Sequence, residues 1–232
     1  MKNSPSSQET LEKIYKRLFA HFGPQHWWPG ETSFEIAVGA ILAQNTSWNN
    51  ASRAIENLKK ARLLNPKSLR QLPIKKLAQG IRSSGYFNQK ARKLKMFLQY
   101  LQSRYGGRMG NMQKAALPKL REELLKINGI GPETADSILL YALHKPIFVV
   151  DAYTKRVLAR HSLISWNASY DEIQGFFLGN LPKSVRFFNE YHALIVALGK
   201  KLCHKTYPKC NLCPLASIGK LQIEPSSRQK KK

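Results

Sequence analysis

Residues 127–151, INGIGPETADSILLYALHKPIFVVD, contain two glycines two positions apart and end on an aspartate that follows an apolar run. The preceding stretch, LPKLREELLKI at 117–127, repeats its apolar residues at helical spacing. Pro132 suits the first position of a second helix, where no backbone N–H is needed. The sequence therefore predicts a helix-hairpin-helix over residues 117–143.

The two hairpin glycines, Gly129 and Gly131, do not make a dinucleotide-binding fingerprint, which needs a preceding strand and a third glycine. They would let backbone N–H groups approach a phosphate at the positive end of the second helix. Such a device binds one DNA strand without reading its bases. In the alternative interpretation the glycines only end one helix and begin another, and Asp151 only caps the helix that follows.

The charge balance points to a polyanionic partner. The 232 residues include 38 Lys and Arg against 14 Asp and Glu, a formal net charge of +24. Nucleic acid is the commonest intracellular polyanion, while a solvated basic surface and an acidic membrane are the alternatives. No apolar run is long enough to span a bilayer, and MKNSPSSQET has no signal-peptide core. We expect an intracellular, soluble protein.

Helical periodicity runs through almost the whole chain, which predicts an all-α fold of about ten short helices. The β-like run IFVV at 147–150 is too short to found a sheet. Residues 1–8 and 221–232 are predicted to be disordered, the latter as a basic tail.

Several motifs in order resemble one known family. LLKINGIGPETADSILLYA followed by VVDAYTKRVLAR resembles the helix-hairpin-helix and Gly-Pro-Asp region of the endonuclease III superfamily of DNA glycosylases. The resemblance extends to FEIAVGAILAQNTSWNNASRAIENL, SGYFNQKARKL and the Cys-rich C-terminus, about residues 25–215. It implies two α-helical domains with a DNA-binding groove between them. A six-helix domain would span 30–146, and the domain at 147–220 would pack with segment 1–29.

The resemblance also assigns site residues. Asp151 matches the catalytic carboxylate, which would stabilise the oxocarbenium charge that develops when an N-glycosidic bond breaks. Gly129, Gly131 and Thr134 would bind DNA phosphates. Gln44, in AQNT, matches the residue that wedges into the base stack, although a helix C-terminal glutamine that bonds to backbone is the plainer alternative.

Two differences from the family pattern narrow the range of reactions that we expect. Members that also cut the strand carry a Schiff-base lysine where this chain has Glu133, and a carboxylate cannot form an imine. A monofunctional glycosylase without AP lyase activity is therefore expected. The mismatched-adenine branch carries a glutamate where this chain has Ala40, so the acid that would protonate a neutral leaving base is missing.

A base that is already cationic could leave without an acid. Trp27, Trp28 and Pro29, together with Trp48 after QNT, resemble the base pocket of the 3-methyladenine DNA glycosylases. Aromatic faces attract a flipped cationic base by stacking and cation–π interaction. The alternative is that these tryptophans are core residues. Adjacent tryptophans followed by Pro-Gly cannot both face one core, so at least one is expected to line a site.

Cys203, Cys210 and Cys213 match three positions of the family's four-cysteine iron–sulfur loop, and Gly219 occupies the fourth. Three thiolates can hold a [4Fe-4S] or [3Fe-4S] cluster if His204, water or nothing completes it. The alternative is a degenerate loop that has lost its cluster, with its lysines still contacting phosphates.

The resemblance thus implies a base-excision glycosylase for alkylated purines such as 3-methyladenine in double-stranded DNA. It also implies a monomeric, cytoplasmic, nucleoid-associated bacterial protein without a membrane partner. Two alternatives stay open: a glycosylase with lyase activity on oxidised pyrimidines, and a DNA-binding module without catalysis. Glu133 disfavours the first, and the carboxylate at Asp151, which phosphate binding does not need, disfavours the second.

Overall fold

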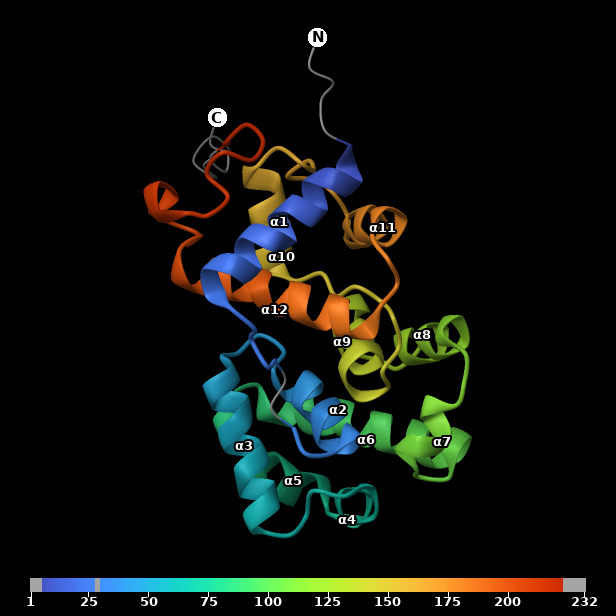
Figure 1. Ribbon diagram of the computed structural model, residues 1–232. Coiled ribbons are helices and arrows are strands. Elements are labelled where there is room, and N and C mark those ends of the chain that lie inside the picture. The colour runs from blue at the N-terminus through green and yellow to red at the C-terminus, as the bar shows by residue number, and fades with distance from the viewer. Residues whose placement is uncertain (1–5, 28–29, 223–232) are drawn as a thin grey trace, which may run out of the picture. The chain divides into compact units, whose positions relative to one another are not determined.

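The computed structural model describes residues 6–27 and 30–222, and every regular element in these ranges is helical (Figure 1). This confirms the predicted all-α fold. In chain order the elements are α1 (Ser7–Phe22), α2 (Ser33–Leu42), α3 (Trp48–Lys60), α4 (Pro66–Gln71), α5 (Ile74–Gly80), η1 (Arg82–Ser84), α6 (Phe87–Tyr105), α7 (Met109–Gln113), α8 (Leu117–Leu125), α9 (Pro132–Ser137), the π-helical turn η2 (Ile138–Ala142), α10 (Ala152–Arg160), α11 (Tyr170–Asn180), α12 (Val185–Lys201) and η3 (Cys210–Leu212).

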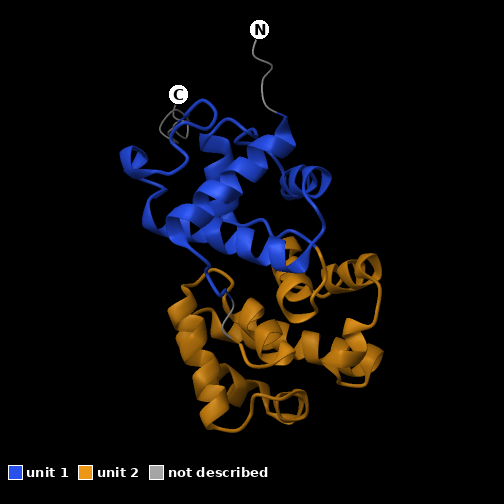
Figure 2. Ribbon diagram, viewed as in Figure 1, with its two compact units in different colours: residues 1–27, 147–232 blue, residues 28–146 orange. Residues whose placement is uncertain are grey.

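The chain divides into two compact units. One comprises residues 28–146, and the other combines residues 1–27 with residues 147–232 (Figure 2). The second unit is therefore built from both ends of the chain. In the described residues, no helix is both long and apolar enough to cross a membrane.

Helix α2 forms the centre of the unit 28–146, where it packs against α3, α6, α9 and η2. Its residues are buried on nearly every side, as its almost wholly apolar sequence predicts. Lys90 of α6 is 2 % exposed, and its Nζ donates to the carbonyls of Leu42 (2.8 Å) and Ser84 (2.6 Å). Burial lowers the pKa of Lys90 to about 8. This ammonium satisfies the carbonyls at the ends of α2 and η1.

Helix α12 forms the centre of the other unit, where α1 and α10 pack against it. Gly199 permits the approach of α10, because a Cβ there would lie 2.3 Å from the ring of Tyr153. Tyr191 donates from its buried hydroxyl to the carbonyl of Leu11 on α1 (2.8 Å). This hydrogen bond joins segments from opposite ends of the sequence.

Helix α1 begins at Ser7, within the segment 1–8 that the sequence predicts to be disordered. Ser6 caps the helix at the Glu9 N–H, and the Glu9 side chain accepts in return from the Ser6 N–H. This capping box orders the first turn, so the disorder prediction is wrong for residues 6–8. Most of the predicted basic tail, residues 223–232, lies outside the described residues.

Candidate active site and DNA-binding hairpin

The hairpin between α8 and α9 separates buried isoleucines from exposed glycines. Ile127 and Ile130 are buried, and the Ile130 N–H donates to the Ile127 carbonyl (3.0 Å), which closes the turn. Gly129 and Gly131 are exposed. Gly131 is the N-cap of α9 and brings no capping side chain to the first turn of this helix. The hairpin can therefore offer backbone N–H groups to an anion.

The backbone conformation of Gly129 and the side chain packed against it both favour glycine at this position, whether or not DNA is bound. Its φ of +86° lies in the left-handed region, which favours glycine. A Cβ at this position would lie 2.6 Å from Cε of Lys93, a residue of α6. At Gly131, by contrast, a Cβ would meet nothing within 4 Å. The two glycines therefore have different structural constraints.

The Gln44 side chain reaches the hairpin. Its Nε2 donates to the Gly129 carbonyl (3.1 Å) and to the Thr134 hydroxyl (2.8 Å). Its Oε1 accepts from Nζ of Lys93 at 2.5 Å. The structure thus brings Gln44, Gly129 and Thr134 together. It holds the amide of Gln44 against the hairpin, and the buried Thr134 hydroxyl faces this amide. The wedge and phosphate-binding roles of these residues stay predictions.

Glu133 lies in the first turn of α9 and is exposed. A carboxylate suits this place, because the positive end of a helix favours negative charge. Its backbone carbonyl accepts from the Ser137 hydroxyl (2.7 Å). Position 133 therefore places a carboxylate beside the hairpin.

Asp151 is the N-cap of α10, as the plainer interpretation of the sequence holds. Its Oδ1 accepts from the Thr154 N–H (2.7 Å) and from the Thr154 hydroxyl (2.9 Å). Its side chain is 13 % exposed, and Oδ2 lies 3.6 Å from Nε2 of His192. The cap thus uses one carboxylate oxygen only. Capping and catalysis are compatible at this residue.

The Asp151 carboxyl is held in its ionised form. Burial by itself raises the pKa, but His192 and the two Thr154 donors together outweigh burial and bring the pKa below its usual value. Asp151 therefore stays anionic at neutral pH. Sequence reasoning missed His192, because a single histidine on the buried face of α12 carries no motif.

The structure describes two of the four residues of the predicted base pocket, Trp27 and Trp48. Trp27 is half-buried and belongs to the unit formed by the chain ends, where Nζ of Lys200 lies 5.3 Å from the centre of its ring. Trp48 is half-buried and opens α3 in the other unit. Trp28 and Pro29 lie outside the described residues. The aromatic pocket therefore stays a prediction.

The three cysteines line one small cavity beside His161, Leu202 and Pro208. Nη1 of Arg160, a buried residue, donates to Sγ of Cys203 (3.2 Å) and to the His204 carbonyl (2.5 Å). Burial, together with the neighbouring thiols, raises the pKa of Cys213. In the described part of the chain, no three His, Cys, Asp or Glu side chains are arranged to hold a metal ion.

Gly219 occupies the fourth position of the cysteine loop, and its surroundings exclude a cysteine side chain there. Its φ is +63°, and a Cβ there would lie 2.0 Å from the His161 carbonyl oxygen. No side chain fits without movement of the backbone, so the loop does not match a four-ligand cluster. A cluster on three cysteines stays a prediction.

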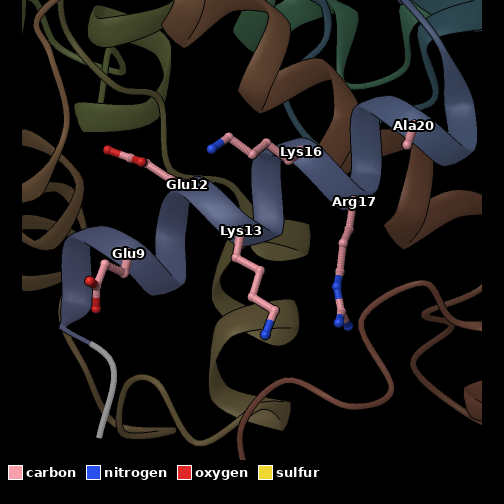
Figure 3. A pocket seen from close by; sticks show the side chains of 6 residues that line it. All are labelled: Glu9, Glu12, Lys13, Lys16, Arg17 and Ala20. Atoms are coloured by element: carbon pink, nitrogen blue, oxygen red, sulfur yellow. The ribbon is translucent and has the colours of Figure 1, made fainter. Parts of the chain in front are cut away.

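A surface hollow of about 420 Å³ lies along α1 (Figure 3). Its six lining residues all come from this one helix: Glu9, Glu12, Lys13, Lys16, Arg17 and Ala20. Nη1 of Arg17 donates a hydrogen bond to the Ser217 hydroxyl (2.6 Å). Mixed charges on an open helix face are typical of a solvated surface, and we assign no function to this hollow.

Comparison with known proteins places this geometry in a family context. Residues 38–183 match the model of HhH-GPD, described as "HhH-GPD superfamily base excision DNA repair protein". A protein of Methanocaldococcus jannaschii named "Putative DNA repair glycosylase MJ1434" is 49% identical over 209 residues, 89% of this chain and 94% of the relative.

Two solved structures share the fold. The H. pylori 3-methyladenine DNA glycosylase (MagIII) bound to 1,N6-ethenoadenine is 30% identical, with a TM-score of 0.72 over 85% of this chain and 98% of that chain. A trapped endonuclease III–DNA covalent intermediate is 24% identical, with a TM-score of 0.79 over 93% and 96%.

Proposed function

The chain belongs to the HhH-GPD superfamily of base excision DNA repair proteins, and we propose that it is a monofunctional DNA glycosylase that releases alkylated, cationic purines such as 3-methyladenine from double-stranded DNA. Asp151 is the catalytic carboxylate in this proposal. The observation that carries it is the geometry of Asp151, whose side chain is largely buried and uses only Oδ1 for capping.

The chemistry follows from that geometry. As the bond between base and sugar breaks, positive charge develops on the sugar, and a fixed carboxylate stabilises it. The electrostatic effect is strongest in a site with little water. A cationic base leaves as a neutral molecule, so no general acid is required. This agrees with the buried Ala40, which has no acid to offer.

We expect no lyase activity because of the positions of the amines near the hairpin. A Schiff-base lysine needs an accessible, unprotonated amine, and position 133 carries a carboxylate. Lys90 has a suitably lowered pKa of about 8, but it is buried and donates to two carbonyls. The Lys93 ammonium is bound by Gln44. In this proposal neither amine attacks the sugar.

The choice of a cationic base rests on the tryptophans and on the similarity to the H. pylori enzyme. Nζ of Lys200 lies 5.3 Å from the centre of the Trp27 ring, so one face of this ring already interacts with a cation. A base would stack on the opposite face. Trp28, Pro29 and Trp48 are the other residues that the sequence assigns to this pocket.

For DNA contact we propose phosphate binding by Gly129, Gly131 and Thr134, and a base-stack wedge at Gln44. Tyr86 is a second candidate for stacking, because it is 66 % exposed and has a left-handed φ of +44°. Aromatic rings stack on bases of any sequence. Separate Gln44→Ala and Tyr86→Ala variants, assayed on duplex and single-stranded substrates, identify the wedge. Replacing the residue that acts as the wedge should reduce base release from duplex DNA more than release from single-stranded DNA.

The proposal is tested by incubating the protein with dimethyl-sulfate-treated duplex DNA and identifying the bases released. We expect 3-methyladenine, with no strand cleavage and no covalent adduct after borohydride reduction. Release of oxidised pyrimidines with a borohydride-trapped adduct would instead support the bifunctional alternative. DNA binding without release of any base would support the non-catalytic module.

A further inference from the structure

A buried histidine stands beside the proposed catalytic carboxylate. His192 lies on the buried face of α12, and its Nε2 is 3.6 Å from Oδ2 of Asp151. The two residues are 41 positions apart, and the packing of α10 against α12 brings them together. Oδ1 is held by Thr154, so His192 faces the oxygen that the helix cap does not use.

The orientation of the imidazole is fixed by its surroundings. The ring lies almost perpendicular to the ring of Phe148, at 84° with the centres 6.4 Å apart. The neighbouring Tyr191 anchors α12 through its hydrogen bond to Leu11. A buried ring held in this way cannot turn toward solvent without disturbing the core.

Several ionisable groups of the surrounding elements have hydrogen-bond partners other than Asp151. On α10, Lys155 donates to the Ala168 carbonyl (2.7 Å) and Arg156 to the carbonyls of Cys203 (2.9 Å) and Gly199 (3.2 Å). On α12, Glu190 accepts from the Gln25 N–H (2.7 Å).

On α11, the Tyr170 hydroxyl accepts from the Val150 N–H (3.3 Å). In the described part of the chain, the ionisable partner of Asp151 is His192, with Nε2 3.6 Å from Oδ2. This histidine is therefore the ionisable side chain that faces Oδ2.

We propose that His192 is a positioning residue that keeps Asp151 ionised and holds Oδ2 ready for the sugar cation. This inference rests on the function proposed for Asp151. A carboxylate this deeply buried would otherwise tend to take up a proton, because burial disfavours the charged form. An imidazole at this distance opposes that tendency when it carries a proton, and its removal would leave the carboxylate without this partner.

The test is an NMR titration of the Asp151 carboxyl carbon in the wild type, His192→Phe and His192→Gln. Loss of the imidazole should raise the pKa of Asp151 by about one unit or more, the usual effect of an opposite charge at this distance. The acidic limb of the single-turnover pH profile should move with it, so that release at acidic pH falls about tenfold per unit. His161→Gln is the matched control, since His161 is also buried but binds the Ile218 carbonyl (2.7 Å).

If Asp151 titrates at the wild-type pH in the His192 variants, the inference is wrong. His192→Gln decides the matter should His192→Phe fail to fold, because its amide keeps a polar group but not the charge. A shift in the His161→Gln control as large as in the His192 variants would also overturn it. A wild type that releases no alkylated base would refute the proposed function alone, because the NMR titration does not depend on activity.

Discussion

The side chain of Lys93 lies across Gly129, so that a Cβ on the glycine would sit 2.6 Å from Lys93 Cε and 2.8 Å from its Cγ. Nζ of Lys93 donates a hydrogen bond to Oε1 of Gln44, and Nε2 of Gln44 donates one to the Gly129 carbonyl. The hairpin is thereby held by α6 and by the segment after α2, independently of any DNA.

The first prediction separates the two glycines. Gly129→Ala should destabilise the free protein by about 1–3 kcal/mol, because the methyl collides with Lys93 and the backbone is left-handed. Gly131→Ala should leave the melting temperature nearly unchanged but weaken DNA binding, because its Cβ projects into open space beside the helix amides. Melting curves and binding isotherms check both results. A Gly131→Ala variant with full affinity would remove this position from the DNA interface.

The second prediction concerns the cap at Asp151. Asp151→Ala should cost about 0.5–2 kcal/mol of stability, whereas Asp151→Asn should cost less, because asparagine also caps helices well. The lowered pKa means that the ionised Asp151 contributes stability above its unfolded pKa of about 3.9. This contribution is lost as the pH falls through the folded-state value. Denaturation curves at neutral pH and at about pH 3 should therefore show the wild-type advantage over Asp151→Asn shrinking.

The third prediction tests the proposed aromatic pocket. Trp48→Ala should slow release of cationic 3-methyladenine more than it lowers the melting temperature or the DNA affinity, because the ring face attracts the charged base. A core tryptophan would instead cost about 3–5 kcal/mol and reduce every activity together. Release rates for charged and neutral lesions, measured beside melting temperatures, distinguish the two.

The fourth prediction concerns the cysteine loop. Protein produced without iron, or treated with a chelator, should keep its melting temperature, because Arg160 and the backbone contacts around Gly219 hold the loop. Arg160→Met should lower it, since three acceptors would lose their donor. A large loss of stability on iron removal would show that a cluster holds the loop instead.

Local patterns predicted much of the fold. Apolar spacing indicated the helices, and the Gly-Ile-Gly-Pro turn indicated the hairpin, because these features depend on neighbouring residues. The resemblance to the endonuclease III superfamily, and to its 3-methyladenine branch, is confirmed. The start of α1 was missed although Ser6 and Glu9 have capping-box spacing.

The contacts of the candidate site were not predictable in the same way. His192 approaches Asp151 only through the packing of α10 on α12, and Lys93 meets Gly129 only because α6 crosses the hairpin. Both pairs are far apart in sequence and belong to no local pattern. The residue types at these positions are common in helices, so neither pair could be recognised before folding.

The central claim is that Asp151 catalyses base release, and the most direct test is the single-turnover rate of 3-methyladenine release by the wild type and Asp151→Asn. The asparagine keeps the cap and the shape of the side chain but removes the negative charge. We expect the variant to bind DNA with nearly wild-type affinity and to release no measurable base. Release at the wild-type rate would show that the carboxylate is only a helix cap and that the catalytic assignment is wrong.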